Sequence, residues 1–114
     1  MRDRSLYLKD ILNAIESIET FMVGMDSEAF RTDDKTASAV IRKLEVIGEA
    51  VKQLPEGVQQ RYPNIPWKQV AGMRDKLIHF YFGVDPGLIW QTVTSRLPSL
   101  KATIQEMLEC GGFP

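Results

Sequence analysis

The residues best suited to chemistry lie within eight positions of one another, from Arg74 to Tyr81. Asp75 and His79 are four residues apart, so on a helix the carboxylate can accept a hydrogen bond from one imidazole nitrogen. That bond would fix the tautomer of the only histidine in the chain and leave its other nitrogen facing a substrate. Tyr81 follows Arg74 by seven residues, so its hydroxyl can lie near the guanidinium. The stretch therefore brings together an imidazole, a guanidinium, a carboxylate and a phenol.

A helix over residues 67–83 is predicted to carry these groups. Pro66 suits its first turn, and Gly83 follows the last periodic residue. Arg74 falls in the middle of the apolar face, where a guanidinium is costly unless an anion pairs with it. Glu49, on the edge of another predicted helix, can be that anion. The apolar face consists of Trp67, Val70, Ala71, Leu77, Ile78 and Tyr81.

Arg74 and His79 do not share a face of this helix, because five residues place two side chains about 140° apart. A site that uses both side chains is therefore expected to include the same helix of a second chain. Apolar residues near the edges of the fold also favour a homodimer. These residues are Met73, Phe80, Phe82 and Trp90.

Each of these residues also has a simpler explanation. A lone histidine near a helix end is more often a surface or capping residue than a catalyst. Arg74 can form a structural ion pair with Glu49, and Tyr81 can belong to the core. Lys68 and Lys76 fit a solvated surface, with a weaker role in attracting phosphates. The simpler explanations lose weight because all of these groups occur so close together in the sequence.

The elements that must position the site are helices, since no segment alternates with period two. Apolar residues recur at helical spacing in four long segments, residues 5–23, 34–54, 67–83 and 86–108. Short helices or turns are predicted at residues 26–30 and 55–63, and Pro98 is predicted to interrupt the last helix. The fold class is all-α, an up-and-down four-helix bundle with one or two short extra helices in a single domain, residues 1–114.

Composition excludes several classes of site. The net charge is −1, so the chain as a whole gives no electrostatic argument for nucleic acid, and any phosphate site must be a local arrangement. One cysteine, Cys110, excludes an intrachain disulfide, and with a single histidine a zinc site is not expected. No metal or other cofactor is expected. Without a membrane-spanning stretch or a signal peptide, a cytoplasmic location fits best.

The stretch from Arg74 to Tyr81 reads RDKLIHFY and matches R-x4-H-x-Y, the motif of HepT-like toxins in the HEPN ribonuclease superfamily. The chain resembles this family at further positions in the same order and spacing. They are residues 44–50 (LEVIGEA), 65–67 (IPW), 71–75 (AGMRD) and 84–98. The resemblance therefore covers nearly the whole chain.

The resemblance implies a HEPN-like helical domain that dimerises and brings two copies of the motif together in a cleft. It implies metal-independent RNA cleavage in which His79 activates the 2′-hydroxyl or positions the scissile phosphate, while Arg74 stabilises the developing charge. Asp75, where the family often has asparagine, and Glu49 would support these groups. Tyr81 matches the tyrosine that a partner nucleotidyltransferase (MntA-like) antitoxin modifies with AMP.

The working hypothesis is a ribonuclease toxin of a toxin–antitoxin pair. The alternative is a non-catalytic helical partner that binds a nucleotidyltransferase through its bundle surface. A third reading is a structural helical dimer in which Arg74 only pairs with Glu49.

Overall fold

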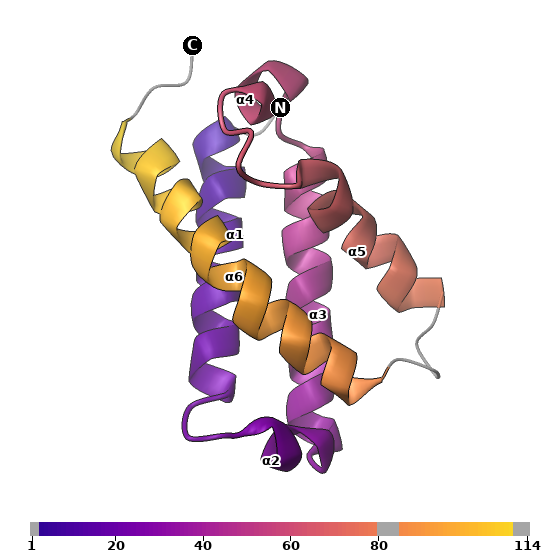
Figure 1. Ribbon diagram of the computed structural model, residues 1–114. Helices are drawn as coiled ribbons and strands as arrows, with labels where there is room; N and C mark the ends of the chain where they lie inside the picture. The colour runs from indigo at the N-terminus through magenta and orange to yellow at the C-terminus, as the bar shows by residue number, and fades with distance from the viewer. Residues whose placement is uncertain (1–2, 80–84, 111–114) are drawn as a thin grey trace.

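The computed structural model describes residues 3–79 and 85–110, with the backbone alone for Arg74 and residues 76–79. Within this part every regular element is a helix (Figure 1). In chain order the helices are α1 (Arg4–Phe21), α2 (Ser27–Arg31), α3 (Asp34–Lys52), α4 (Glu56–Gln60), α5 (Trp67–His79) and α6 (Pro86–Glu109). The predicted all-α class is confirmed, with α1, α3, α5 and α6 as the long helices.

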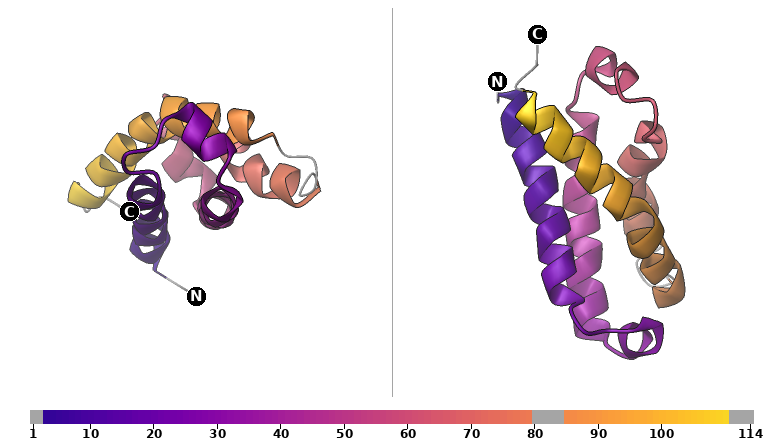
Figure 2. Two further views of the ribbon diagram at one scale, coloured as in Figure 1. Left: turned by 90° about the horizontal axis from the view of Figure 1, so that it is seen from below. Right: turned by 60° about the vertical axis from the view of Figure 1, so that its left-hand side comes forward.

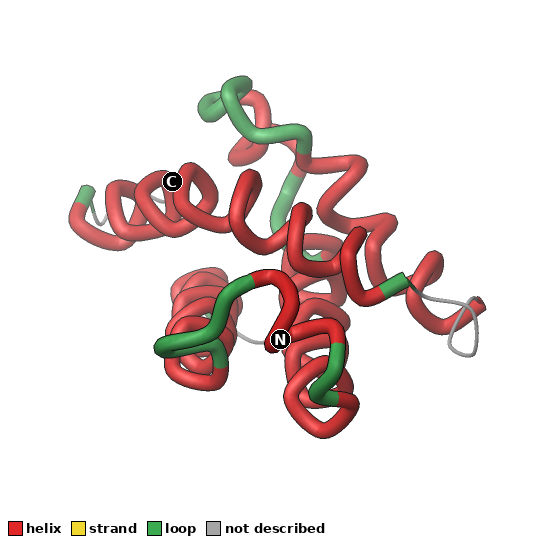
Figure 3. The backbone as a smooth tube through the Cα atoms, turned by 60° about the horizontal axis from the view of Figure 1, so that its bottom comes forward, coloured by secondary structure: helices red, strands yellow, loops and turns green. Residues whose placement is uncertain are grey.

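The long helices follow an up-and-down course in two layers. Helices α1 and α3 run antiparallel and pack against each other, and α5 packs on the other side of α3. Helix α6 returns diagonally across α1 and α3, as the view along these two helices shows (Figure 2). The short α2 lies under the first part of α6 and joins α1 to α3 (Figure 3). The motif-bearing α5 is therefore held mainly by α3.

Aspartates fix the points where four of the helices begin. Each carboxylate accepts a hydrogen bond from a backbone N–H of the first turn, which would otherwise lack a partner. The capping residues are Asp3 on α1, Asp26 on α2, Asp33 on α3 and Asp85 on α6. The Thr36 N–H and hydroxyl both donate to Asp33, and these bonds lower the pKa of that carboxyl below its ordinary value.

The core is built from the apolar stripes that the sequence predicts on α1, α3 and α6. Fully buried residues follow the helical spacing, for example Leu8, Ile11, Ile15 and Ile18 of α1. Phe30 of α2 is also fully buried, and its ring lies 5.7 Å from that of Trp90 on α6. The polar interruption of the α1 stripe, Glu19, is exposed. Its carboxylate accepts from Lys101 of α6 at 2.9 Å, and this bond raises the pKa of the lysine.

Two predicted helix ends are wrong by two residues. Helix α1 ends at Phe21 rather than at residue 23, and the chain turns at Gly24, where φ is +74°. Helix α3 ends at Lys52 rather than at residue 54. There the Gln59 side chain donates to the carbonyls of Val51 and Leu54, at 3.2 and 3.3 Å. The Gln59 amide thus satisfies carbonyls at the end of α3, where the following Pro55 has no N–H to donate.

Helix α6 continues through Pro98, from Pro86 to Glu109, so the predicted interruption is not a break in the helix. A proline inside a helix leaves the carbonyl four residues earlier without a donor, here that of Thr94. Both Pro98 and Thr94 are exposed, so water can satisfy that carbonyl. The buried residues on the opposite side, such as Leu97 and Leu100, keep the helix packed.

Candidate functional site

The first turns of α5 are anchored to the bundle by Trp67 and Val70. Both residues are buried, with 7% and 4% of their surface exposed. The Trp67 indole N–H donates to the Tyr62 carbonyl at 2.9 Å, so the polar end of the ring is satisfied. Just before α5, the Asn64 amide donates to the buried hydroxyl of Thr103 on α6, at 3.1 Å. These contacts fix the start of the helix whose later turns carry the motif.

Arg74, Asp75 and His79 all lie on α5, as predicted, and the described helix extends to His79. Their five-residue spacing on this helix places Arg74 and His79 about 140° apart. The side chains of Arg74 and His79, and all of Tyr81, lie outside the described residues. The pairing of Arg74 with Glu49, the bond between Asp75 and His79, and the contact of Tyr81 with Arg74 therefore stay predictions.

Asp75 lies on the side of α5 that faces α3. Lys52 Nζ approaches its two carboxylate oxygens at 3.3 and 3.4 Å, and the two side chains are 34% and 57% exposed. An exposed pair of this kind contributes less than about 1 kcal/mol to stability. The effect of the ion pair on the site is electrostatic, because the pair places the Lys52 ammonium group beside Asp75, which is next to Arg74 in the chain. Lys52 is not among the predicted site residues.

A sequence signal for Lys52 does exist. It follows Gly48 by four residues and therefore lies on the same side of α3. Gly48 is buried inside the apolar stripe of α3, and a glycine at such a position leaves room for the close approach of another helix. Helix α5 is one of the helices that pack against α3. A lysine on the same side of α3 as Gly48 is therefore a candidate for contact with α5.

Glu49, the other predicted supporting residue, is exposed on the outer face of α3. It lines a polar hollow of about 410 Å³, together with Tyr7 and Asp10 of α1 and with Arg42 of its own helix. The supporting role of Glu49 at the motif stays a prediction.

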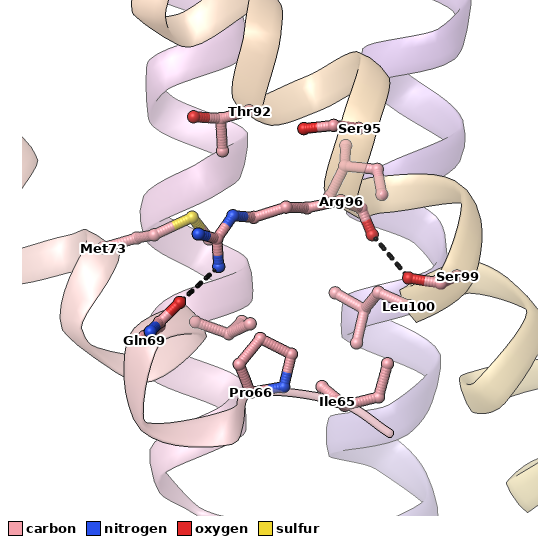
Figure 4. A pocket seen from close by; sticks show the side chains of 11 residues that line it. Ile65, Pro66, Gln69, Met73, Thr92, Ser95, Arg96, Ser99 and Leu100 are labelled. Carbon is pink, nitrogen blue, oxygen red and sulfur yellow. Dashed lines mark hydrogen bonds between the residues drawn. The ribbon is translucent and has the colours of Figure 1, made fainter. Parts of the chain in front are cut away.

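A second hollow, of about 270 Å³, lies between α5 and α6 (Figure 4). Gln69 and Met73 line it from α5, and Arg96 extends across it from α6. Arg96 Nη1 donates to the Gln69 amide oxygen at 2.7 Å. Met73 directly precedes Arg74, so this hollow adjoins the motif in the chain. Neither Gln69 nor Arg96 is among the predicted site residues.

The described residues contain no group of three or more histidine, cysteine, aspartate or glutamate side chains that could hold a metal ion. In the same part of the chain, no helix is long and apolar enough to cross a membrane. The groups available near the motif are cations, an amide and a carboxylate. The cations and the amide suit the binding of an anion such as a phosphate, whereas the carboxylate opposes it.

An all-α bundle with arginine and histidine five residues apart on its third long helix defines the class of protein. Residues 11–107 match the family model described as HepT-like, Ribonuclease HepT-like. The chain belongs to this HepT-like ribonuclease family. No solved structure matches it.

Individual relatives agree with this assignment. A protein of Thermococcus cleftensis named "Probable ribonuclease HepT" is 49% identical over 106 residues, which cover 93% of this chain and 96% of the relative. A protein of Methanocaldococcus jannaschii named as a candidate RNase is 45% identical and covers 95% of this chain and 93% of its own length. Another candidate RNase, from Caldanaerobacter subterraneus, is 43% identical over 90% of this chain and 92% of its own. The predicted family is confirmed.

Proposed function

We propose that this protein, a single domain over residues 1–114, is the RNA-cleaving toxin of a toxin–antitoxin pair and acts in the cytoplasm. The observation that carries the proposal is the placement of Arg74 and His79 on one helix, α5, in a chain of the HepT-like ribonuclease family. RNA itself supplies the nucleophile, so the reaction needs no metal ion. This proposal makes Arg74 and His79 the catalytic residues.

The proposed reaction is an attack of the ribose 2′-oxygen on the adjacent phosphorus. His79 accepts the proton of the 2′-hydroxyl, the new P–O2′ bond forms and the P–O5′ bond breaks. Arg74 stabilises the negative charge that grows on the phosphate oxygens during this step. The leaving 5′-oxygen takes a proton from the imidazolium of a second His79. The products are a 2′,3′-cyclic phosphate and a 5′-hydroxyl end.

A homodimer supplies that second imidazole. On one α5 the two catalytic residues lie about 140° apart, so a single helix presents them to different sides. Two copies of α5 facing each other can combine Arg74 of one chain with His79 of the other. Asp75 and Glu49 then have supporting roles, the first by orienting a neighbour and the second as an anion for Arg74.

The partner that controls the toxin is, in this proposal, a nucleotidyltransferase antitoxin of the MntA-like kind. It transfers AMP from ATP to the hydroxyl of Tyr81, which follows His79 by two residues, and pyrophosphate leaves. A bulky, charged adenylate beside Arg74 and His79 would exclude the RNA phosphate by size and by charge repulsion.

Cleavage of a labelled RNA by purified protein tests the catalytic assignment. His79→Ala and Arg74→Ala should each lower the rate by at least about a hundredfold, the usual contribution of a general base or of a charge-stabilising group. Arg42→Ala is the matched control, because Arg42 is 72% exposed on α3 and pairs there with Glu45. Unchanged cleavage in both test variants would overturn the proposal. Unmodified wild-type protein that never cuts RNA but binds a nucleotidyltransferase would favour the non-catalytic alternative.

A further inference from the structure

The hollow between α5 and α6 has a closed apolar floor and a polar rim. Its floor is formed by Ile65, Val70, Leu97 and Leu100, each at most 4% exposed. Pro66 and Met73 line one side, as Figure 4 shows. With about 270 Å³ it is slightly smaller than most ligand pockets, whose volumes are about 300–1,000 Å³. It therefore suits one flat ring system rather than a larger molecule.

The rim carries a positive charge that no carboxylate among the described residues neutralises. Arg96 is exposed, and its hydrogen-bond partner in that part of the chain is the neutral amide oxygen of Gln69. An arginine has five N–H donors in a planar fork, so one bond to an amide leaves most of them for a ligand. A phosphate is the anion that this geometry binds best.

Three hydroxyl groups on α6 add hydrogen-bond acceptors. Thr92, Ser95 and Ser99 line the hollow, and each hydroxyl donates to a backbone carbonyl of its own helix. Because the hydrogen is used in this way, the oxygen can still accept a bond from a ligand N–H. The Gln69 amide supplies the opposite function, since its oxygen accepts from Arg96 and its NH2 group remains a donor.

We infer that this hollow is a subsite for one nucleotide of single-stranded RNA, next to the nucleotide whose phosphate is cut. This inference rests on the proposed function. The base lies on the apolar floor against Pro66 and Met73, its edge meets Gln69 and the α6 hydroxyls, and the adjoining phosphate binds Arg96. Sequence-specific RNA recognition generally uses bases splayed out of a single strand in this way.

The position of the hollow along α5 fits a flanking nucleotide. Met73, which lines the hollow, directly precedes Arg74, the residue that stabilises the scissile phosphate in the proposed reaction. A nucleotide bound at Met73 is therefore a neighbour of the phosphate that Arg74 of the same chain binds.

Binding of a labelled single-stranded RNA with 2′-O-methyl groups tests the subsite, since this RNA cannot be cut. Arg96→Gln should weaken binding about tenfold, the size of one charge-assisted hydrogen bond. It should also lower the slope of log Kd against log salt by about 0.7, as expected for one lost phosphate contact on a single strand. Ser95→Leu, which fills the hollow without changing the charge, should weaken binding and leave that slope as in the wild type.

Arg42→Gln is the control, because it removes the same charge from the outer face of α3. Arg42→Gln should change the RNA affinity and the slope of log Kd against log salt less than Arg96→Gln does. Thermal melting of Arg96→Gln separates a role in binding from a role as a strut between α5 and α6. In cleavage of ordinary RNA, Arg96→Gln should raise KM and keep kcat, whereas His79→Ala removes kcat.

Wild-type affinity and slope in Arg96→Gln would overturn the subsite and leave the proposed ribonuclease in place. Weaker binding with an unchanged slope and a lowered Tm would also overturn it, because a strut alone explains that result. A wild-type protein that neither binds nor cuts RNA would overturn both proposals.

Discussion

Lys52 of α3 and Asp75 of α5 are joined by an ion pair, with 3.3 Å between Nζ and Oδ2. The pair connects the two helices directly beside the motif. Because Asp75 stands next to Arg74 in the chain, the lysine reduces the negative charge that a carboxylate would otherwise place near an RNA phosphate. The pair therefore matters more for the charge of the site than for the stability of the bundle.

Opposite changes of this pair should have opposite effects on RNA binding. Asp75→Asn removes a negative charge and should lower KM for RNA cleavage a few-fold, whereas Lys52→Ala removes a positive charge and should raise KM. Both should change the Tm little, because the pair is exposed. Glu106→Gln, an exposed change on α6, is the control for net charge. Equal KM values in all four proteins would contradict this role.

A matched pair of glycine variants should separate backbone strain from packing. A Cβ at Gly24 or at Gly57 would meet no other atom within 4 Å, so neither change creates a clash. Gly24 has φ +74°, a conformation that costs alanine about 1–2 kcal/mol, so Gly24→Ala should lower the free energy of unfolding by that amount. Gly57, inside α4, should instead gain about 0.4–1 kcal/mol as alanine. Urea unfolding of both variants measures the difference, and equal shifts would refute the strain at Gly24.

The cap of α3 should make stability depend on pH on the acid side. Hydrogen bonds from Thr36 lower the pKa of Asp33 in the folded state, from an ordinary value of 3.8. Its stabilising contribution is therefore complete above pH 3.8 and is lost as the pH falls through the lower, folded pKa. Asp33→Ser keeps a capping oxygen that does not titrate. The Tm of the wild type should exceed that of this variant at neutral pH, and the difference should shrink below about pH 4. A Tm difference that stays constant down to about pH 2 would contradict the prediction.

Modification of Tyr81 should be visible in the intact mass. Protein produced together with its nucleotidyltransferase should be heavier by one or more AMP units, and the added mass should map to Tyr81. Tyr81→Phe should abolish the added mass and leave RNA cleavage active in the presence of the antitoxin. Tyr62→Phe is the control for loss of a phenol, because Tyr62 packs against the core before α5 begins. Full modification of Tyr81→Phe would move the acceptor to another residue.

The helices were predictable because their signals are local. The buried stripe of α1, from Leu8 to Ile18, follows from spacing alone, and α2 begins after Asp26, in the segment predicted as a short helix or turn. The exact end of α3 was not predictable, since the N–H groups of Gln53 and Leu54 donate to carbonyls three residues earlier instead of four. The effect of Pro98 depends on which side of α6 faces water, which a pattern fixes only after the packing is known.

The candidate site divides in the same way. The positions of Arg74, Asp75 and His79 on one helix follow from the sequence. Contacts between distant residues do not, because Lys52 lies 23 residues from Asp75 and Gln69 lies 27 residues from Arg96. No periodicity relates such pairs, so the charge beside the motif and the hollow next to it become visible only in the folded chain.

The even number of long helices has a practical consequence for experiments. Helix α1 begins and α6 ends at the same end of the bundle, whereas α5 runs away from that end (Figure 1). A fluorophore or a solid support attached beyond Arg4 or Glu109 is therefore kept at a distance from His79. Protein immobilised through either end should therefore leave the motif open to long RNA. The choice between the two ends should make little difference, because both lie at the same end of the bundle.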